Sequence, residues 1–104
     1  MLGTSLSVKP LLQISDGRIV VLEKVRTSTK ALARLLRLTL DAAGDGPVDV
    51  AVQHLDALDR ATELTEQLRA GIADLGELYM SEVGAVVGVH LGPGVIATVI
   101  VRRD

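Results

Sequence analysis

Residues 6–15 alternate apolar side chains with mostly polar ones, and this period of two is typical of a β-strand with one buried face. The apolar positions are Leu6, Val8, Pro10, Leu12 and Ile14. A second β-rich run follows at residues 18–25. The intervening Asp16-Gly17 predicts a hairpin, because both central residues of a type I′ turn need a positive φ. Since Pro10 lacks an N–H, we expect the first strand to lie at a sheet edge or to carry a bulge.

Two later segments repeat apolar residues every three or four positions, which predicts amphipathic helices. The first follows residues 27–29, whose hydroxyl groups are candidate N-caps, and ends at Gly44. Its apolar face comprises Leu32, Leu35, Leu36, Leu40 and Ala43, and its charged face comprises Lys30, Arg34, Arg37 and Asp41. We interpret the charged face as solvated. Asp56 is expected to cap the second helix, whose apolar face comprises Leu58, Ala61, Leu64, Leu68 and Ile72.

Three further strands are predicted at residues 48–53, 77–82 and 95–101, while residues 84–89 fit either a short helix or irregular chain. Two helices are too few to cover both faces of a sheet of about five strands. We therefore expect one domain over residues 1–104, an α+β two-layer sandwich in which both helices cover one face of a mixed or antiparallel sheet. The other sheet face is then partly apolar, which usually marks a partner or a ligand groove.

Composition narrows the function classes. The chain has 104 residues, 48% of them hydrophobic, with one Tyr and neither Phe nor Trp, so the core is aliphatic. The lack of aromatic platforms and the net charge of −2 argue against nucleic-acid binding. The absence of Cys excludes disulfides and thiolate sites. No apolar run is long enough to span a membrane and the N-terminus lacks a signal-peptide layout, so we expect a cytoplasmic protein.

Arg26 and His90 are the candidate site residues, since each lies beside a predicted strand. A guanidinium and an imidazole together suit an anionic head group such as a carboxylate or phosphate. Thr27 and Ser28, at a helix N-terminus, are candidate supporting groups. Two alternatives remain: Arg26 forms an ion pair with a nearby carboxylate, or His90 is an ordinary loop residue.

The remaining motifs add little chemistry. Gly92 and Gly94 flank a proline in a turn that permits close backbone approach to a ligand. His54 is interpreted as a structural or turn residue, and no third ligand at a recognisable spacing completes a metal site with the two histidines. No phosphate-binding loop or nucleophile elbow is present, so these motifs assign no catalytic residue.

Four segments in order resemble the C-terminal domain of the DegV family, bacterial proteins that bind fatty acids. They are residues 7–12 (SVKPLL), 16–19 (DGRI), 22–27 (LEKVRT) and 89–94 (VHLGPG). The resemblance implies a lipid carrier, with no cofactor and no enzyme activity of its own. Its apolar tunnel, between two domains, holds one long-chain fatty acid. It also implies that some members present the carboxylate to a fatty acid kinase. The family's head-group arginine and histidine correspond to Arg26 and His90.

The resemblance also implies an N-terminal α/β domain whose Thr and Ser residues grip the carboxylate, and this sequence does not contain it. We therefore expect either a fragment or a stand-alone half, which forms a homodimer or docks with the missing domain. The leading hypothesis is a fatty-acid-binding protein or its C-terminal half. The alternative is an interaction or dimerisation module without its own ligand. A phosphotransfer enzyme using His90 is the weakest hypothesis, because the sequence has no nucleotide or metal motif.

Overall fold

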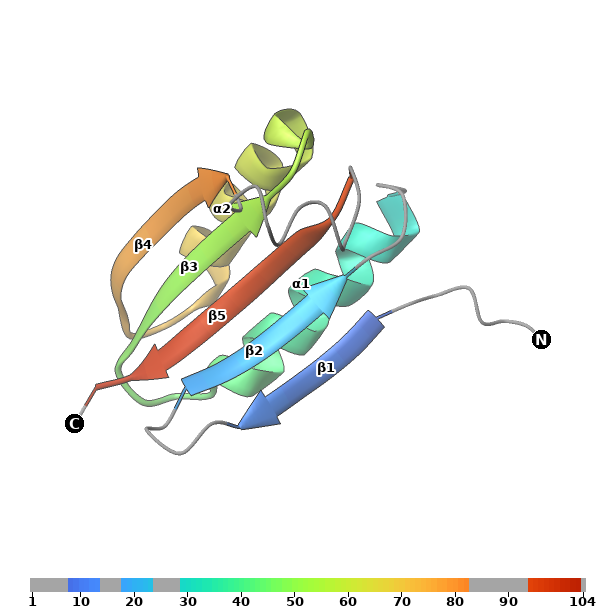
Figure 1. The fold of residues 1–104 in the computed structure, drawn as a ribbon. Helices are drawn as coiled ribbons and strands as arrows, with labels where there is room; N and C mark the ends of the chain where they lie inside the picture. Colours follow the sequence, from blue (N-terminus) through green and yellow to red (C-terminus); the bar gives the residue numbers. More distant parts are fainter. Residues whose placement is uncertain (1–7, 14–17, 24–28, 83–93, 104) are drawn as a thin grey trace.

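The computed structural model describes residues 8–13, 18–23, 29–82 and 94–103. Its elements are β1 (Val8–Gln13), β2 (Arg18–Glu23), α1 (Thr29–Ala43), β3 (Val48–His54), α2 (Leu58–Gly71), β4 (Leu75–Glu82) and β5 (Ile96–Arg102). The strands form a sheet in the order β1-β2-β5-β3-β4 (Figure 1). The β3–β4 pair is parallel and the other three pairs are antiparallel. Neither described helix is long and apolar enough to cross a membrane.

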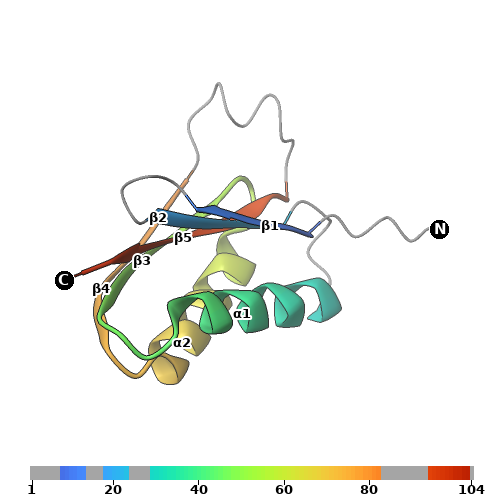
Figure 2. The same cartoon turned by 90° about the horizontal axis from the view of Figure 1, so that it is seen from below.

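Both helices lie on one face of the sheet, and no described element covers the opposite face, the outer face (Figure 2). This arrangement confirms the predicted α+β fold with two helices on a mixed sheet. The boundaries differ slightly from those predicted, since β4 begins at Leu75 and β5 runs one residue further, to Arg102. The expectation for residues 84–89 lies outside the described residues.

The first two strands pair antiparallel, as the hairpin prediction requires, although the turn at residues 14–17 lies outside the described residues. Both expectations drawn from Pro10 are confirmed. The strand β1 lies at the edge of the sheet, and its register with β2 shifts between Pro10 and Leu12. A missing N–H is tolerated there because an edge strand has one unpaired side and a bulge interrupts the ladder.

The core lies between the helices and the sheet. Strand β3 alternates buried and half-buried residues along its length, as its period-two pattern predicts. The core cluster includes Leu35 of α1, Leu64 and Leu68 of α2, and Ile96 and Ile100 of β5, and none of these side chains is more than 1% exposed. The charged face predicted for α1 is exposed at Lys30, Arg34, Arg37 and Asp41.

Two threonines form a polar contact inside this core, which the apolar pattern does not predict. Thr39 of α1 and Thr98 of β5 are fully buried, and their hydroxyl oxygens lie 2.9 Å apart. Thr39 donates its proton to the Leu35 carbonyl at 2.8 Å, so Thr98 must be the donor between the two hydroxyls. The pair therefore ties α1 to the centre of the sheet.

The C-terminus of α1 is held by a residue nearly sixty positions away. Gly44 adopts a φ of +62° and donates to the Leu40 carbonyl, which ends the helix as predicted. The last turn of α1 contains no basic residue. Arg102 at the end of β5 instead donates to the carbonyls of Ala42 and Ala43 at 2.7 and 2.9 Å. Its charge also complements the negative end of the helix dipole.

Two expectations for α2 are wrong. Asp56 does not cap the helix: it lies before the N-cap in a left-handed conformation with a φ of +56°, and the N-cap residue is Ala57. Leu58 is 57% exposed, whereas Ala61, Leu64 and Leu68 are buried as predicted. The reason is positional, because Leu58 begins the helix and therefore lies beyond the edge of the surface that packs on the sheet.

The parallel pair β3–β4 contains an irregularity that a side chain stabilises. Its register shifts between Val48, which faces Leu75, and Val50, which faces Leu78. Within the shift, the carboxylate of Asp49 accepts the N–H of Glu77 at 2.8 Å and lies 3.5 Å from the guanidinium of Arg103. The Asp49 side chain of β3 thus accepts a backbone hydrogen bond from β4 at the point where the register of the two strands shifts.

Candidate functional site

Most residues of the predicted anion site lie outside the described part of the chain. Arg26, Thr27 and Ser28 belong to residues 24–28, and His90 and Gly92 belong to residues 83–93. Their joint role as a head-group site therefore stays a prediction. Among the predicted site residues, the structure describes Gly94.

The segments carrying Arg26 and His90 nevertheless join the same end of the sheet. Glu23, the last residue of β2, pairs with Ile96, the first residue of β5. Ile96 also pairs with His54 at the end of β3, and His54 pairs with Glu82 at the end of β4. Chain segments that leave neighbouring strands at one end begin close together. The strand arrangement that a shared Arg26–His90 site requires is therefore present.

Gly94 anchors the beginning of β5 to the loop that follows β3. Its N–H donates to the Leu55 carbonyl at 2.8 Å, and the Leu55 N–H donates to the Val95 carbonyl at 3.1 Å. Gly94 has a φ of +89°, which disfavours any residue with a Cβ. No described atom lies within 4 Å of the place where that Cβ would stand. The glycine is needed for its backbone conformation, and its open side leaves room for close approach.

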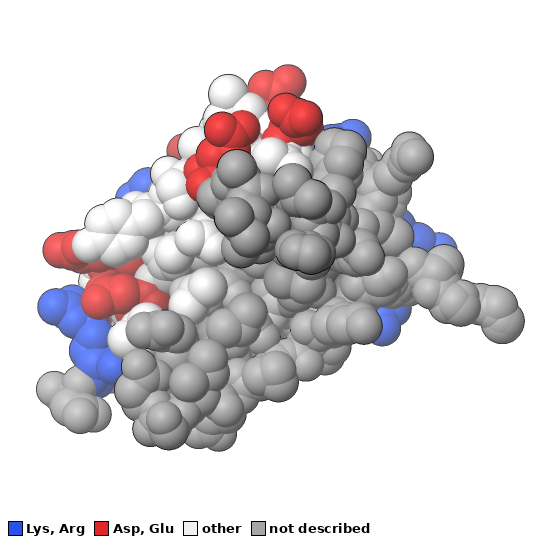
Figure 3. Space-filling model, in the orientation of Figure 1, with Lys and Arg blue, Asp and Glu red and all other residues white. Residues whose placement is uncertain are grey.

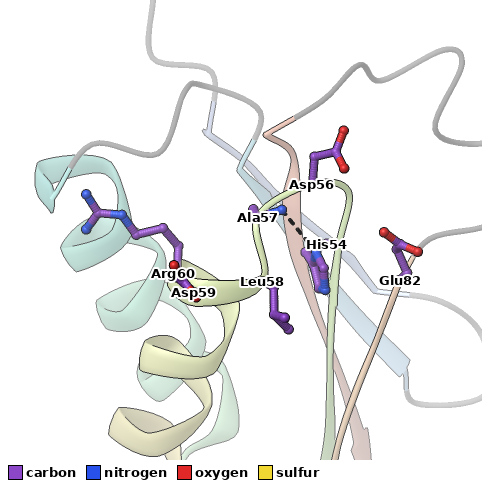
Figure 4. Close-up of a pocket in the computed structure, with 7 residues that line it drawn as sticks. All are labelled: His54, Asp56, Ala57, Leu58, Asp59, Arg60 and Glu82. Carbon is purple, nitrogen blue, oxygen red and sulfur yellow. Dashed lines mark hydrogen bonds between the residues drawn. The ribbon is translucent and has the colours of Figure 1, made fainter.

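His54 is confirmed as a structural turn residue. Its side chain is 6% exposed, and its Nδ1 accepts the N–H of Ala57 at 3.2 Å (Figure 4). Because Nδ1 accepts this bond, Nε2 is the ring nitrogen left to donate a proton. The histidine thus satisfies a backbone donor just before α2, a position where Ala57 offers no side-chain cap.

A cleft of about 650 Å³ surrounds this turn. It is lined by His54, Asp56, Ala57, Leu58, Asp59, Arg60 and Glu82. In Figure 4 the carboxylates of Asp56 and Glu82 point out of the fold, whereas Arg60 points towards α1. Arg60 also lies 3.7 Å from Glu63 of its own helix. Three carboxylates and a partnered arginine make this cleft acidic, so it does not suit a carboxylate or phosphate ligand.

The described residues contain no cluster of three or more His, Asp or Glu side chains that could hold a metal ion. His54 could act as an acid or base only through Nε2, because Nδ1 is engaged with the backbone. None of the described residues that line the cleft is a serine or threonine that could act as a nucleophile beside it. In the described part of this region, the contact that His54 makes is the one that stabilises the turn before α2.

The outer face of the sheet carries an apolar patch. Thr98 and Ile100 point to the helices, so the alternate residues Ala97, Val99 and Val101 of β5 point outwards. Ala51 of β3 and Tyr79 of β4 complete a shallow hollow of about 180 Å³ that also borders Asp49 and Val50. We call Ala51, Tyr79, Val99 and Val101 the outer patch.

The outer patch confirms the expectation that one sheet face remains partly apolar. Tyr79 was not predicted as part of it. Its side chain is 56% exposed, and its hydroxyl donates to the carboxylate of Glu77 two residues earlier on the same strand. Two signals could have identified it. Tyr79 is the single aromatic residue of the chain, and it lies between Leu78 and Met80 in a strand, so its side chain points to the opposite face from theirs.

Comparisons with known proteins agree with this fold. A family model described as uncharacterised proteins of the DegV family matches residues 1–103. A DegV domain-containing protein of Streptomyces coelicolor is 52% identical over 103 residues, covering 99% of this chain and 37% of that protein. A fatty acid binding DegV family protein from Streptococcus agalactiae, a solved structure, is 40% identical with a TM-score of 0.65. That match covers 83% of this chain and 30% of that one.

A second solved structure, DegV, a fatty acid binding protein from Bacillus subtilis, is 34% identical with a TM-score of 0.64. That match covers 78% of this chain and 29% of the solved one. The chain thus spans about a third of the length of the curated relatives it matches, with shares of 37% and 34% in two of them.

Proposed function

Because the chain belongs to the DegV family, we propose that it binds a long-chain fatty acid as the C-terminal domain of a longer protein. Two similar solved structures, from Streptococcus agalactiae and Bacillus subtilis, are themselves described as fatty acid binding. The proposal treats residues 1–104 as one domain that supplies one wall of the ligand site. The remaining wall belongs to the part of the relatives that this chain does not span.

The observation that carries the proposal is the row of apolar side chains on the outer face of β5. From Ala97 to Val101 the row covers about 13 Å, at about 3.3 Å per residue. Ala97 is buried, Val99 is half-buried and Val101 is 36% exposed. The row begins beside Ile96, at the sheet end where the segments of Arg26 and His90 attach. An acyl chain could lie along this row with its carboxylate at that end.

In this proposal Arg26 and His90 bind the carboxylate. A guanidinium forms a charge-assisted hydrogen bond to a carboxylate, and an imidazole N–H adds a second donor. Thr27 and Ser28 support them with hydroxyl groups, and Gly92 and Gly94 allow the backbone to approach.

The proposed role is that of a carrier, which holds the acid and presents its carboxylate to a fatty acid kinase. The second candidate function is an interaction module that binds no ligand. The exposure of Tyr79, at 56%, is the observation that favours it. In that case the outer patch would be covered by a second copy or by the missing domain.

Native mass spectrometry of the longer protein, with the N-terminal domain restored, tests the proposal. We expect a co-purified mass of one fatty acid. Val99→Glu should abolish it by placing a charge in the acyl path, and Arg26→Ala should weaken binding about tenfold or more. Asp41→Ala, on the exposed face of α1, is the control and should bind normally.

The interaction module would be established instead if the unaltered protein carries no ligand and has the mass of a dimer, and if Val99→Glu converts that dimer to a monomer. Unchanged fatty-acid binding by both Arg26→Ala and His90→Ala would contradict the head-group assignment while leaving lipid binding intact.

A further inference from the structure

The strand β4 lies at one edge of the sheet and pairs only with β3 among the described strands. The opposite edge is protected, because β1 carries Lys9, Pro10 and a shift in register. Strand β4 has no Pro, Lys or Arg, and its register with β3 is regular from Leu78 to Glu82. No described strand pairs with its outer side, where the outward-pointing backbone N–H and C=O groups form a row along the edge.

Exposed apolar side chains flank this open edge on both faces of the sheet. The described large hydrophobic residues with exposed side chains are Leu58, Tyr79, Met80 and Val101, at 57%, 56%, 38% and 36%. Tyr79 lies on the outer face, in the outer patch with Val101. Met80 lies on the helix face, where its sulfur accepts a weak hydrogen bond from Thr62 of α2. Leu58 begins the same helix.

The surroundings of the edge are acidic. Asp56, Asp59, Glu77 and Glu82 are all exposed, and they lie on β4 or at the start of α2. Figure 3 shows acidic side chains gathered over this side of the molecule. The nearest described cations are partnered, since Arg60 pairs with Glu63 and Arg103 with Asp49. The field at the β4 edge is therefore negative.

We propose that the open edge of β4 receives an extended segment of a partner protein, with lysine or arginine side chains alternating with apolar ones. In strand addition the backbone hydrogen bonds supply affinity, and alternate side chains supply specificity. The apolar side chains of the partner would contact Tyr79 on the outer face of the sheet. Its basic side chains would then lie on the helix face, where they would meet Glu82.

Charge complementarity selects this occupant over a second copy of the chain. Two β4 edges brought together would place acidic residues of both copies close to one another, and like charges near a strand pair are destabilising. A basic strand converts the same carboxylates into attractive partners and speeds its own encounter with the edge. The β4 edge shares Tyr79 with the outer patch, but it contains neither the apolar row from Ala97 to Val101 nor the residues proposed to bind the carboxylate, so the peptide test and the fatty-acid test can succeed or fail separately.

The test uses the 104-residue chain and a short capped peptide of alternating lysine and valine. Binding is followed by amide chemical shifts in nuclear magnetic resonance spectra. We expect shifts concentrated at residues 78–82, with slowed hydrogen exchange there. The same peptide with alternate backbone nitrogens methylated should not bind, because it cannot complete the ladder. A glutamate–valine peptide should bind at least about tenfold more weakly.

Matched charge reversals separate the edge from the overall charge. Glu82→Lys should weaken binding of the lysine–valine peptide about threefold to fivefold, as expected for an exposed charge pair. Asp41→Lys changes the net charge equally but lies on α1, which is remote from β4, and it should change binding less than twofold. Far-ultraviolet circular dichroism confirms that both variants fold.

Three results would overturn the proposal. Peptide-induced shifts could map to another surface. The acidic peptide could bind as tightly as the basic one. Finally, shifts at residues 78–82 that grow with protein concentration, without any peptide, would show that a second copy occupies the edge.

Discussion

The buried hydroxyl pair of Thr39 and Thr98 leads to a prediction about coupled stability. Both side chains are 0% exposed, and valine has nearly the shape of threonine. In Thr98→Val, the Thr39 hydroxyl loses an incoming hydrogen bond but still donates to the Leu35 carbonyl. In Thr39→Val, the Thr98 hydroxyl loses its described acceptor and remains buried. The two single substitutions are therefore not equivalent.

The magnitudes follow from this asymmetry. Loss of one buried hydrogen bond costs about 0.5–1.5 kcal/mol, so Thr98→Val should destabilise by about 1 kcal/mol. Burying an unsatisfied donor costs about 1–3 kcal/mol, so Thr39→Val should cost about 2 kcal/mol. The double variant buries neither hydroxyl and should lie within about 1 kcal/mol of the unaltered protein, because replacing both partners by apolar groups is nearly neutral.

Urea unfolding followed by circular dichroism at the helix band measures these differences, since the chain has no Trp and a single Tyr. The shift in the urea midpoint of each variant, multiplied by a common slope, yields its change in free energy of unfolding. A double variant that loses the sum of the two single effects would refute the coupling. A slope that differs between variants would mean that the denatured or native state has changed as well.

Three further predictions concern backbone support. Arg102→Met should lower the free energy of unfolding by about 1–2 kcal/mol, because the last carbonyls of α1 lose both donors. Arg102→Lys should lose less, because a lysine keeps the positive charge at the helix C-terminus. Thermal melts measure both variants. Gly94→Ala should destabilise by about 1–2 kcal/mol from its φ of +89° alone. Gly46 has no positive φ, and a Cβ there would make only an ordinary contact of 3.9 Å with the Arg102 guanidinium, so Gly46→Ala should be neutral or slightly stabilising in the same melts. Gly76→Ala places a Cβ against Asp49, so hydrogen exchange at the Glu77 amide should speed up, and unchanged protection there would contradict the role given to that carboxylate.

Much of the fold follows from local patterns. Strand β3 alternates apolar and other residues, and its burial follows that alternation along its length. The apolar stripe of α1 and its stop at Gly44 are confirmed, because a helix end depends on a few neighbouring residues. Pro10 was sufficient to predict an edge strand or a bulge, since a missing N–H is incompatible with a regular ladder on both sides.

The predicted head-group site remains a hypothesis about residues 24–28 and 83–93, although β2 and β5 are neighbours as it requires. The cap at α2 shows why a local motif can mislead. Asp56 has a suitable side chain one position too early, and the buried His54 supplies the acceptor for Ala57 instead. That acceptor depends on the path of the turn, which no single residue type specifies.

Apolar spacing alone predicts which segments are strands and helices and which of their faces are buried, because both depend on residues a few positions apart. The partners across the fold depend on strand order, which brings Arg102 to the end of α1, Thr98 to Thr39 and Asp49 to the backbone of β4. Polar groups bond to whatever donors and acceptors the packed chain places within about 3 Å. Their partners therefore become known only when the elements are assembled, as does the open edge at β4.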